Sequence, residues 1–440
     1  MLMNDQIVVS AVFIVVFIGI ISEKLDKVLI VMFGALALIL TGYIGFEDAI
    51  HAIDFNTICL LLGMMLLVEG MREVKIFDWI ALELGLITKG DPVKVFLLFG
   101  IATAIFSAFL DNVTTVLIMV PLMISLAKGI GLNAKIYILV LVFLSNIGGA
   151  ATLIGDPPNI LIGTQVSSLK FIDFIQYMSI PVIITSILTF WYIKKTKPAD
   201  IKSRNKDFPW LFLSNLMLEQ MKREKAALSI PKSVLVKTSI IFGLVILGFF
   251  SHAIFHLEPA VVALAGAIVM LITFHKKIDL HHLVAHVEWP TLLFFAGLFV
   301  VVGAMEHAGV LETISQSLVQ MTDNLWVLLM IILWASAILS GLVDNIPFVA
   351  VMIPILKQLL AQEPYASNPK AALLWWALAL GACFGGNATM IGASANVVSV
   401  AIAKTRGIHI GFKEFAKEAL PVTLISIIVS SFYLTALYLW

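Results

Sequence analysis

LDNVTTVLIMVPLM at residues 110–123 and VDNIPFVAVMIPIL at residues 343–356 carry the strongest structural signal in the chain, because the same polar pair opens the same apolar pattern twice. A second matched pair follows each of them, IGGAATLIGDPPN at 147–159 and FGGNATMIGASAN at 384–396. Compositional bias would align leucines and valines, but it would not align Asp-Asn, Gly-Gly and Ala-Thr in one order. The chain therefore contains an internal repeat.

The residues around these motifs have the composition of a membrane protein. Of 440 residues, 60% are hydrophobic and 13% are charged, whereas a soluble globular chain is about 45–50% apolar and about 25% charged. The apolar runs are continuous and long enough for helical spans, and they do not alternate as barrel strands would. Lys and Arg equal Asp and Glu at 28 each, which gives no electrostatic signature for a nucleic-acid partner. We expect an all-α polytopic protein in a lipid bilayer.

The only long polar stretch divides the chain into two halves of similar size. We expect residues 194–232 to form a cytoplasmic linker, with a first transmembrane repeat at 1–193 and a second at 233–440. Each repeat is predicted to contain five spans, one of them broken, and one re-entrant hairpin. An odd number of spans inverts the second repeat relative to the first, so the fold class is two inverted-topology repeats.

Hairpins are expected where two apolar arms meet at a polar tip that is too short to carry a crossing. These segments are 92–128 and 325–360. A broken helix is expected in 135–168, where two prolines follow Asp156, and in 371–403, around the matching GASAN segment. Polar, non-helical backbone at membrane depth is tolerated only where it is buried in protein or lines a cavity.

The basic residues predict the orientation. With the N-terminus outside, 25 of the 28 Lys and Arg fall in loops on the cytoplasmic side, and only Lys170, Lys357 and Lys370 fall on the other side. Cytoplasmic loops carry the excess of basic residues. We therefore expect a multi-pass protein of the plasma membrane, or of the inner membrane in a prokaryote, with both termini outside.

Polar side chains at the hairpin tips and helix breaks form the candidate substrate and ion site. Charged groups inside a bilayer are costly and by default mark an ion path, and broken helices direct helix-end charges to a common centre near the midplane. We expect a Na⁺ ion near Asp111, Asn112 and Asp156. The full candidate set is Asp111, Asn112, Thr114, Thr115, Asp156, Asn159, Asp344, Asn345, Asn387, Thr389, Ser394 and Asn396.

Each candidate also has a structural interpretation. Asp and Asn at a hairpin tip can cap the following helix, and Asp156 can do the same after the break. The threonines can bond to carbonyls of their own helices. Gly148-Gly149 and Gly385-Gly386 are interpreted as sites of close helix packing and not as ligands.

The distribution of basic residues constrains the substrate. All four arginines lie in or beside cytoplasmic loops, and no Lys or Arg is expected at the centre. A cation or a neutral acid fits such a site better than a multivalent anion, since buried carboxylates can exchange protons for a cation. We predict Na⁺/H⁺ antiport with no cofactor and with H⁺ or Na⁺ as the coupling ion. A permease for arsenite, antimonite or a small carboxylate remains the alternative, and an enzyme with paired aspartates is disfavoured.

The motifs resemble those of the ion transporter superfamily, in particular the arsenite-permease (ArsB) and NhaD-type branch with its P protein-like permeases. The resemblance covers essentially the whole chain and rests on AFLDNVTTVLIMVPL, SNIGGAATLIGDPPNILIG, LVDNIPFVAVMIPIL and GACFGGNATMIGASANVVSVAIA. It implies scaffold and transport parts in each repeat, ion-coupled secondary transport, often by an elevator-type movement, and commonly a homodimer. Dicarboxylate carriers of the superfamily have Ser-Asn-Thr at both tips. Pro347 and Phe348 remove such hydroxyls from the second tip, so a symmetric pair of carboxylate sites is not expected.

Overall fold

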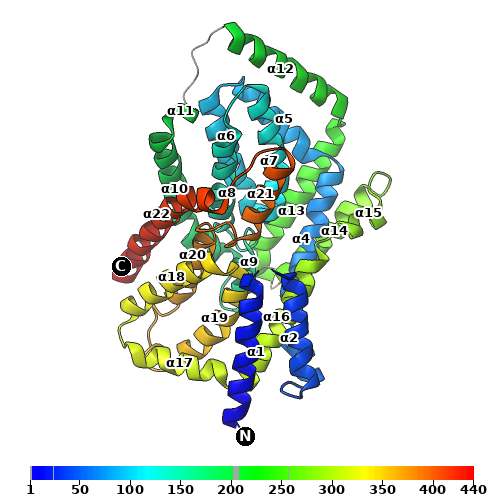
Figure 1. Cartoon of the computed structure of the whole chain (residues 1–440). Helices are drawn as coiled ribbons and strands as arrows, with labels where there is room; N and C mark the ends of the chain where they lie inside the picture. The colour runs from blue at the N-terminus through cyan, green and yellow to red at the C-terminus, as the bar shows by residue number, and fades with distance from the viewer. Residues whose placement is uncertain (1, 23, 202–207, 256) are drawn as a thin grey trace.

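The computed structural model describes residues 2–22, 24–201, 208–255 and 257–440, which form 22 helices and contain no strand (Figure 1). Nine of the helices are long and apolar enough to cross a membrane. Five shorter apolar helices accompany them. The all-helical membrane fold expected from the sequence is therefore confirmed.

The two halves of the chain contain ten helices each, in the same order. Those before the linker are α1 (Leu2–Ser22), α2 (Lys27–Leu40), α3 (Phe46–Ala52), α4 (Phe55–Glu73), α5 (Ile76–Thr88), α6 (Pro92–Phe109), α7 (Asn112–Gly129), α8 (Ala134–Gly149), α9 (Pro157–Gln165) and α10 (Phe171–Thr196). Those after it are α13 (Lys232–Phe255), α14 (Pro259–Thr273), α15 (Leu280–Ala285), α16 (Trp289–His307), α17 (Val310–Met321), α18 (Leu325–Leu342), α19 (Asn345–Leu360), α20 (Leu373–Gly385), α21 (Ser394–Thr405) and α22 (Phe412–Leu439).

The hairpins are α6–α7 and α18–α19, and their helices begin at side-chain caps. Asp91 accepts hydrogen bonds from two amides at the start of α6, and Asn324 does the same at the start of α18. Asp111 and Asp344 cap the second arms. Each cap satisfies amides that have no partner within the helix. Two non-helical residues, Leu110-Asp111 in the first hairpin and Val343-Asp344 in the second, are therefore enough to separate the arms.

Two helices that the apolar runs of the sequence do not predict connect a span to each hairpin. They are α5 and α17. Polar and charged residues on the exposed side of each short helix interrupt its apolar pattern, so neither helix has a continuous apolar run. Lys75 and Lys89, at the ends of α5, adopt positive φ angles and stop the helix on both sides.

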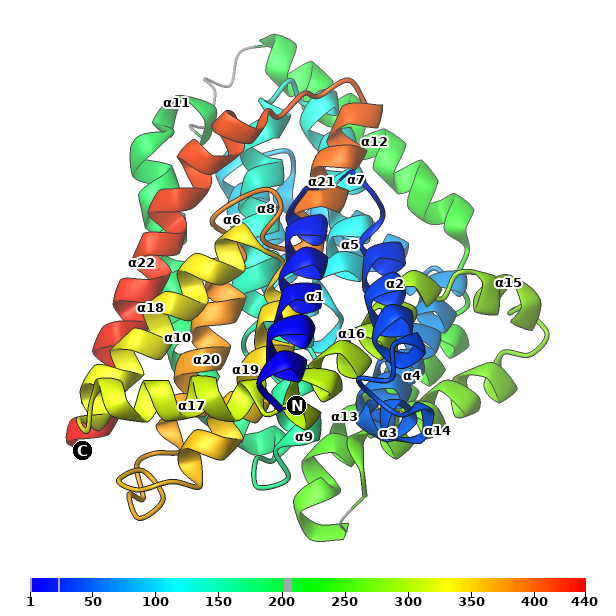
Figure 2. The same cartoon turned by 60° about the horizontal axis from the view of Figure 1, so that its bottom comes forward.

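The linker contains α11 (Pro198–Ile201) and α12 (Phe208–Leu228). Helix α12 packs against α5, where Lys225 pairs with Glu83 and the side chain of Met221 lies over Gly85. In Figure 2 both linker helices lie at the top of the molecule and the C-terminus lies at the lower left.

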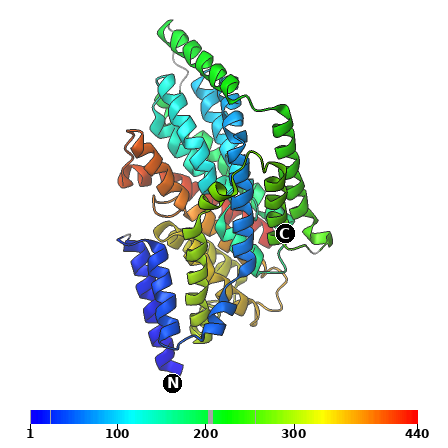
Figure 3. The ribbon, with the colours of Figure 1, turned by 90° about the vertical axis from the view of Figure 1, so that its right-hand side faces the viewer.

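The helices of the two repeats interlock. Helix α4 packs along α14 and α2 packs along α16, whereas α6 packs on α8 and α18 on α20. The second arm of each hairpin lies against the half-helix of the other repeat, α7 against α21 and α19 against α9. Figure 3 shows α1 and α2 side by side at the edge of the molecule. The polar tips and breaks are thereby brought together in the interior.

Candidate functional site

Asp156 lies where the two hairpin tips meet. Its side chain is fully buried, and its Oδ1 accepts hydrogen bonds from Asn112 Nδ2 at 3.2 Å and from Asn345 Nδ2 at 3.4 Å. Its Oδ2 accepts from no N–H or O–H group among the described residues, and the Cys383 thiol lies beside the carboxylate. Although Asp156 is the residue before α9, its side chain makes no capping bond. The capping interpretation of this residue is therefore wrong, and the carboxylate links the two repeats.

The aspartates and asparagines of the tips have different roles. Asp111 accepts from the backbone N–H of Thr114 at 2.8 Å and from the Thr114 hydroxyl, and Asp344 accepts from the Ile346 N–H at 3.4 Å. The aspartates therefore cap, and the next residues, Asn112 and Asn345, reach inward to Asp156. Each tip thus contributes one amide donor to the same carboxylate.

Asn146 connects the first repeat to the break of the second, and the sequence analysis did not include it. Its amide nitrogen donates to Asn387 Oδ1 and to Asn396 Oδ1, both at 2.8 Å, while its Oδ1 accepts from Asn112 at 3.2 Å. A signal was available, because a Ser-Asn pair interrupts the apolar residues of α8. All four asparagines are buried, and the chain of amides continues from Asp156 into the second repeat.

The candidates Asn159 and Asn396 hold the helix breaks in shape. Asn159 Nδ2 donates to the carbonyls of Ala150 and Thr152, at 3.0 and 2.8 Å, and Asn396 Nδ2 donates to those of Gly386 and Thr389, both at 2.8 Å. These bonds satisfy carbonyls that the broken helices leave without a helical partner. Asn396 also accepts from Asn146, so only its oxygen belongs to the central network.

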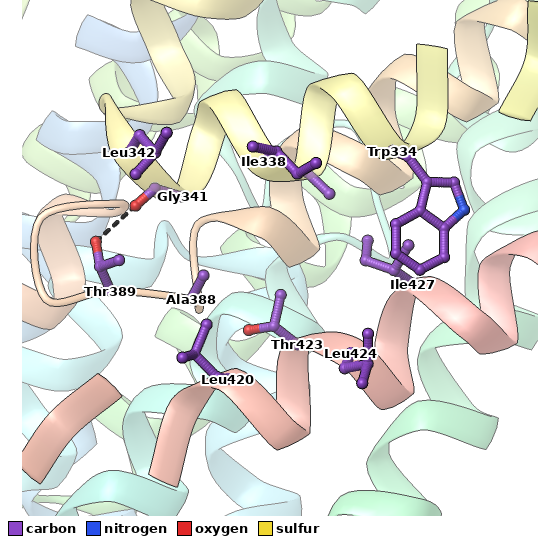
Figure 4. Close-up of a pocket in the computed structure, with 11 residues that line it drawn as sticks. Trp334, Ile338, Gly341, Leu342, Ala388, Thr389, Leu420, Thr423, Leu424 and Ile427 are labelled. Carbon is purple, nitrogen blue, oxygen red and sulfur yellow. Dashed lines mark hydrogen bonds between the residues drawn. The ribbon is translucent and has the colours of Figure 1, made fainter. Parts of the chain in front are cut away.

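Thr152 and Thr389 tie each break to the first arm of its own hairpin. The Thr152 hydroxyl donates to the carbonyl of Ala108, and that of Thr389 donates to the carbonyl of Gly341 at 2.6 Å. Figure 4 shows the second of these bonds at the end of an apolar pocket between α18 and α22, about 260 Å³ in volume. A pocket of about 610 Å³ lies at the equivalent place in the first repeat. Thr389 therefore has a structural partner and does not point to Asp156.

The remaining candidates lie beside the network. Thr115 is buried and its hydroxyl has no partner among the described residues, whereas Thr114 is occupied by Asp111. Ser394 lies 3.5 Å from Asp344 Oδ2 through its hydroxyl. Within the described ranges, no group of three His, Cys, Asp or Glu comes together in a way that would hold a metal ion. Any cation near Asp111, Asn112 and Asp156 would need amide or backbone oxygens as additional ligands.

The expectation of a centre without basic residues is wrong. Lys27, at the first position of α2, places its ammonium 2.6 Å from Asp344 Oδ2 and 3.2 Å from the hydroxyl of Ser394. A pocket of about 430 Å³ adjoins the three side chains. The sequence places Lys27 in a short loop between two spans. Only the packing of that loop against the second hairpin reveals that its long side chain reaches the tip.

Two clefts related by the repeat differ in size. A polar cleft of about 430 Å³ lies between α4, α16 and the arm α19, with Asp54, Glu306 and Lys357 in its lining. The equivalent space beside α7, lined by Glu69, Arg72 and Glu288, measures only about 40 Å³. The arm α19 therefore borders an open cleft, whereas the equivalent arm α7 of the other repeat borders one that is almost closed.

Comparisons with known proteins agree with this architecture. A model of the citrate transporter family (CitMHS) matches residues 17–381. A 46 kDa membrane protein of Mycobacterium leprae is 35% identical, with 99% of each chain covered. An uncharacterized transporter of Mycobacterium tuberculosis is 35% identical over 99% of this chain and 98% of its own.

More distant relatives extend the likeness. The human P protein is 31% identical over 97% of this chain, which spans 59% of the P protein. The crystal structure of the YdaH transporter of Alcanivorax borkumensis, described there as having an unusual topology, matches with a TM-score of 0.52 over 88% of this chain and 87% of its own. At 14% identity this match supports the fold alone.

Proposed function

The chain belongs to the citrate transporter family within the ion transporter superfamily, and from that premise we propose that it exchanges a small cation, Na⁺ in the first instance, for protons. The resemblance to the superfamily and to P protein-like permeases is confirmed. The protein is a multi-pass membrane transporter and not an enzyme, since the family and the relatives with a stated activity are transporters.

Asp156 is the observation that carries the proposal. A fully buried carboxylate with one oxygen that accepts from no N–H or O–H group of the described residues is costly unless it binds a cation or a proton. Carboxylate and amide oxygens are suitable ligands for hard cations, and amide side chains of both hairpin tips contact Asp156. If the Asp156 carboxylate binds either a cation or a proton but never both at once, the cation and the proton must cross the membrane in opposite directions.

The position of Asp156 in the repeat supports the same conclusion. Its counterpart in the second repeat is Ala393, so the two halves of the centre differ by one titratable group. Asn112 and Asn345 donate to it from elements that belong to different repeats. A shift of either hairpin would break one of these bonds, and so the state of the carboxylate would depend on the conformation.

The unequal clefts supply an access route for the proposal. In inverted-repeat transporters the two repeats exchange conformations about a central site. The 430 Å³ cleft beside α19 is open, and its 40 Å³ counterpart beside α7 would open when the hairpins exchange conformations. From the resemblance we retain, as part of the proposal, an elevator-type movement of the hairpin parts and a homodimer.

Lys27 favours a second candidate function, the transport of a small anion such as a carboxylate. The argument against an anion rested on the absence of a central basic residue, and Lys27 supplies one beside a 430 Å³ pocket. The name of the matching family also points to citrate. Arsenite belongs to the same candidate because trivalent arsenic binds thiols. The buried Cys383 thiol lies near the centre, 3.5 Å from Asn159 Oδ1.

The test uses the purified full chain in proteoliposomes that enclose a pH-sensitive dye. Na⁺, Li⁺, arsenite and citrate are added in turn, with choline chloride as the ionic-strength control. Cation–proton exchange predicts a change of internal pH with Na⁺ or Li⁺ that is absent with choline. A response to citrate or arsenite alone would replace the proposal with the anion candidate, and empty liposomes control for leakage.

A further inference from the structure

The pair formed by Lys27 and Asp344 joins helices from opposite ends of the chain. The ammonium of Lys27 lies 2.6 Å from Asp344 Oδ2 and also donates to the Ser394 hydroxyl at 3.2 Å. The Asp344 side chain is only 7% exposed, and that of Lys27 is 35% exposed. Phe294 of α16 covers the ammonium at 5.1 Å from its ring centroid. The carboxylate is thus shielded from solvent, whereas the ammonium stays partly exposed at the edge of the 430 Å³ pocket.

The location of Lys27 is unfavourable unless Asp344 is present. Lys27 is the first residue of α2, and a cation at a helix N-terminus opposes the positive end of the helix dipole. Ser394 and Asp344 lie at the starts of α21 and α19, which add two further positive helix ends. Asp344 is the carboxylate in direct contact with the Lys27 ammonium, and Glu288 acts on the same ammonium from a greater distance.

The first repeat lacks an equivalent pair. Where α2 begins with Asp26-Lys27, α14 begins with Glu258-Pro259. Asp111, the counterpart of Asp344, forms no ion pair with any described residue, and the carboxylate that interacts with it is Glu288, at the start of α16. The tip of the first hairpin thus presents a carboxylate without a bound ammonium, whereas the tip of the second has an ammonium built in.

We propose that Lys27 is a tethered cation that occupies the cation site of the second hairpin tip, so that the protein keeps a single exchangeable cation site, formed by Asp156 and the first tip. The inference deepens the proposed function, and it rests on that function for the claim that the cation at the remaining site exchanges. Lys27 acts as a positioning and specificity-determining residue: it fixes how many cations the centre accepts. It also holds the second tip against α2, and the bond must break if that hairpin moves relative to α2.

The experiment measures the melting temperature of the purified full chain in detergent, in NaCl and in choline chloride of equal ionic strength. A cation that binds only the folded state raises Tm. In Lys27→Met the freed carboxylate of Asp344 becomes a cation site, so the Tm difference between Na⁺ and choline should exceed that of the unchanged protein by a few degrees. Adding Asp344→Asn should bring the difference back to its original value.

Three variants make the result specific. Lys24→Met removes a charge from the same loop, where Lys24 is exposed and forms no ion pair with described residues, and it should leave the Tm difference unchanged. Lys27→Arg keeps the charge and should also leave it unchanged. If Lys27→Met does not fold, Lys27→Gln removes the charge, keeps a donor, and is expected to give the same extra Na⁺ effect.

Two outcomes would contradict the proposal. The first is a Lys27→Met or Lys27→Gln protein that melts lower in both salts by the same amount, which is the behaviour of a purely structural ion pair. The second is an extra Na⁺ effect that survives Asp344→Asn. Neither outcome depends on transport, so a failure of cation–proton exchange in proteoliposomes would be recognised separately.

Discussion

Three residues of the buried network have no equivalent in the other repeat: Asp156, Asn146 and Asn387, whose counterparts are Ala393, Cys383 and Ala150. Asp156 receives hydrogen bonds from both hairpin tips, and Asn146 donates to Asn387 and to Asn396 at the second break. The two repeats share their backbone arrangement, and these three differences supply polar groups that bond from one repeat to the other. A function that needs both repeats to act together therefore depends on residues that break their symmetry.

Replacing Asn146 with Ala should destabilise the protein. The change leaves the side-chain oxygens of Asn387 and Asn396 without the donor that now lies 2.8 Å from each. An unsatisfied buried polar group costs about 1–3 kcal/mol, so a clear fall in Tm is expected. Thr185→Val is the matched control, because the Thr185 hydroxyl is buried without a partner among the described residues and its removal should leave Tm unchanged or higher. Equal shifts in the two variants would contradict the network.

At this scale the sequence predicted the residues of the tips but not their partners. The polar character of Asp111, Asn112, Asp344 and Asn345 in apolar surroundings was sufficient to locate them. Asn146 is hidden because its partners are about 240 residues away. Lys27 could not be predicted either, because its partner Asp344 is 317 residues away. A lysine beside a span ordinarily extends to the membrane surface.

Among the elements, the broken helices depend on close contact with the hairpins. A Cβ added to Gly148 would lie 2.5 Å from Ala104 Cα of α6, and one added to Gly385 would lie 2.6 Å from Ala337 Cα of α18. Both neighbours are backbone atoms of rigid helices, so they cannot move aside as a flexible side chain could. Glycine at these two positions lets the break approach the hairpin closely enough for the bonds from Thr152 and Thr389.

Gly148→Ala and Gly385→Ala should each reduce the yield of folded protein and lower its Tm. Overpacking of a tight core costs about 1–3 kcal/mol and sometimes more. Gly243→Ala provides the control, because a Cβ there would meet nothing within 4 Å and alanine favours a helix. Size-exclusion profiles and thermal melts of the three proteins check the expectation, which fails if Gly148→Ala and Gly243→Ala melt alike.

Helices with a continuous apolar pattern could be predicted from the sequence, whereas amphipathic ones could not. The hairpin arms and the breaks at Asp156-Pro157-Pro158 are marked by Pro, Gly and polar dipeptides. Helix α17, with the sequence VLETISQSLVQM, carries polar residues along its exposed side and has no apolar run of its own. Its existence depends on packing against α16 and α19, which the local sequence does not encode.

For the molecule as a whole, the orientation in the membrane is still a prediction from the 25 basic residues assigned to one side. On a background without Cys59 and Cys383, a cysteine at Lys222 in α12 should react with a membrane-impermeant maleimide only from the cytoplasm. A cysteine at Ser367, exposed between α19 and α20, should react only from outside. Labelling of both from one side would overturn the orientation and the inverted repeat together.

The central feature of the whole molecule is the Asp156 carboxylate, which lies between two hairpins, one from each repeat. The most direct test compares proton-coupled cation exchange in proteoliposomes for the unchanged protein, Asp156→Asn, Asp156→Glu and the control Asp48→Asn, whose carboxylate lies on the exposed side of α3. Asp156→Asn should bind the cation but lose its dependence on the pH gradient, Asp156→Glu should keep part of it with a shifted pH optimum, and Asp48→Asn should behave as the unchanged protein. An Asp156→Asn protein with an unchanged pH profile and undiminished gradient-driven exchange would contradict the claim that Asp156 couples the two ions.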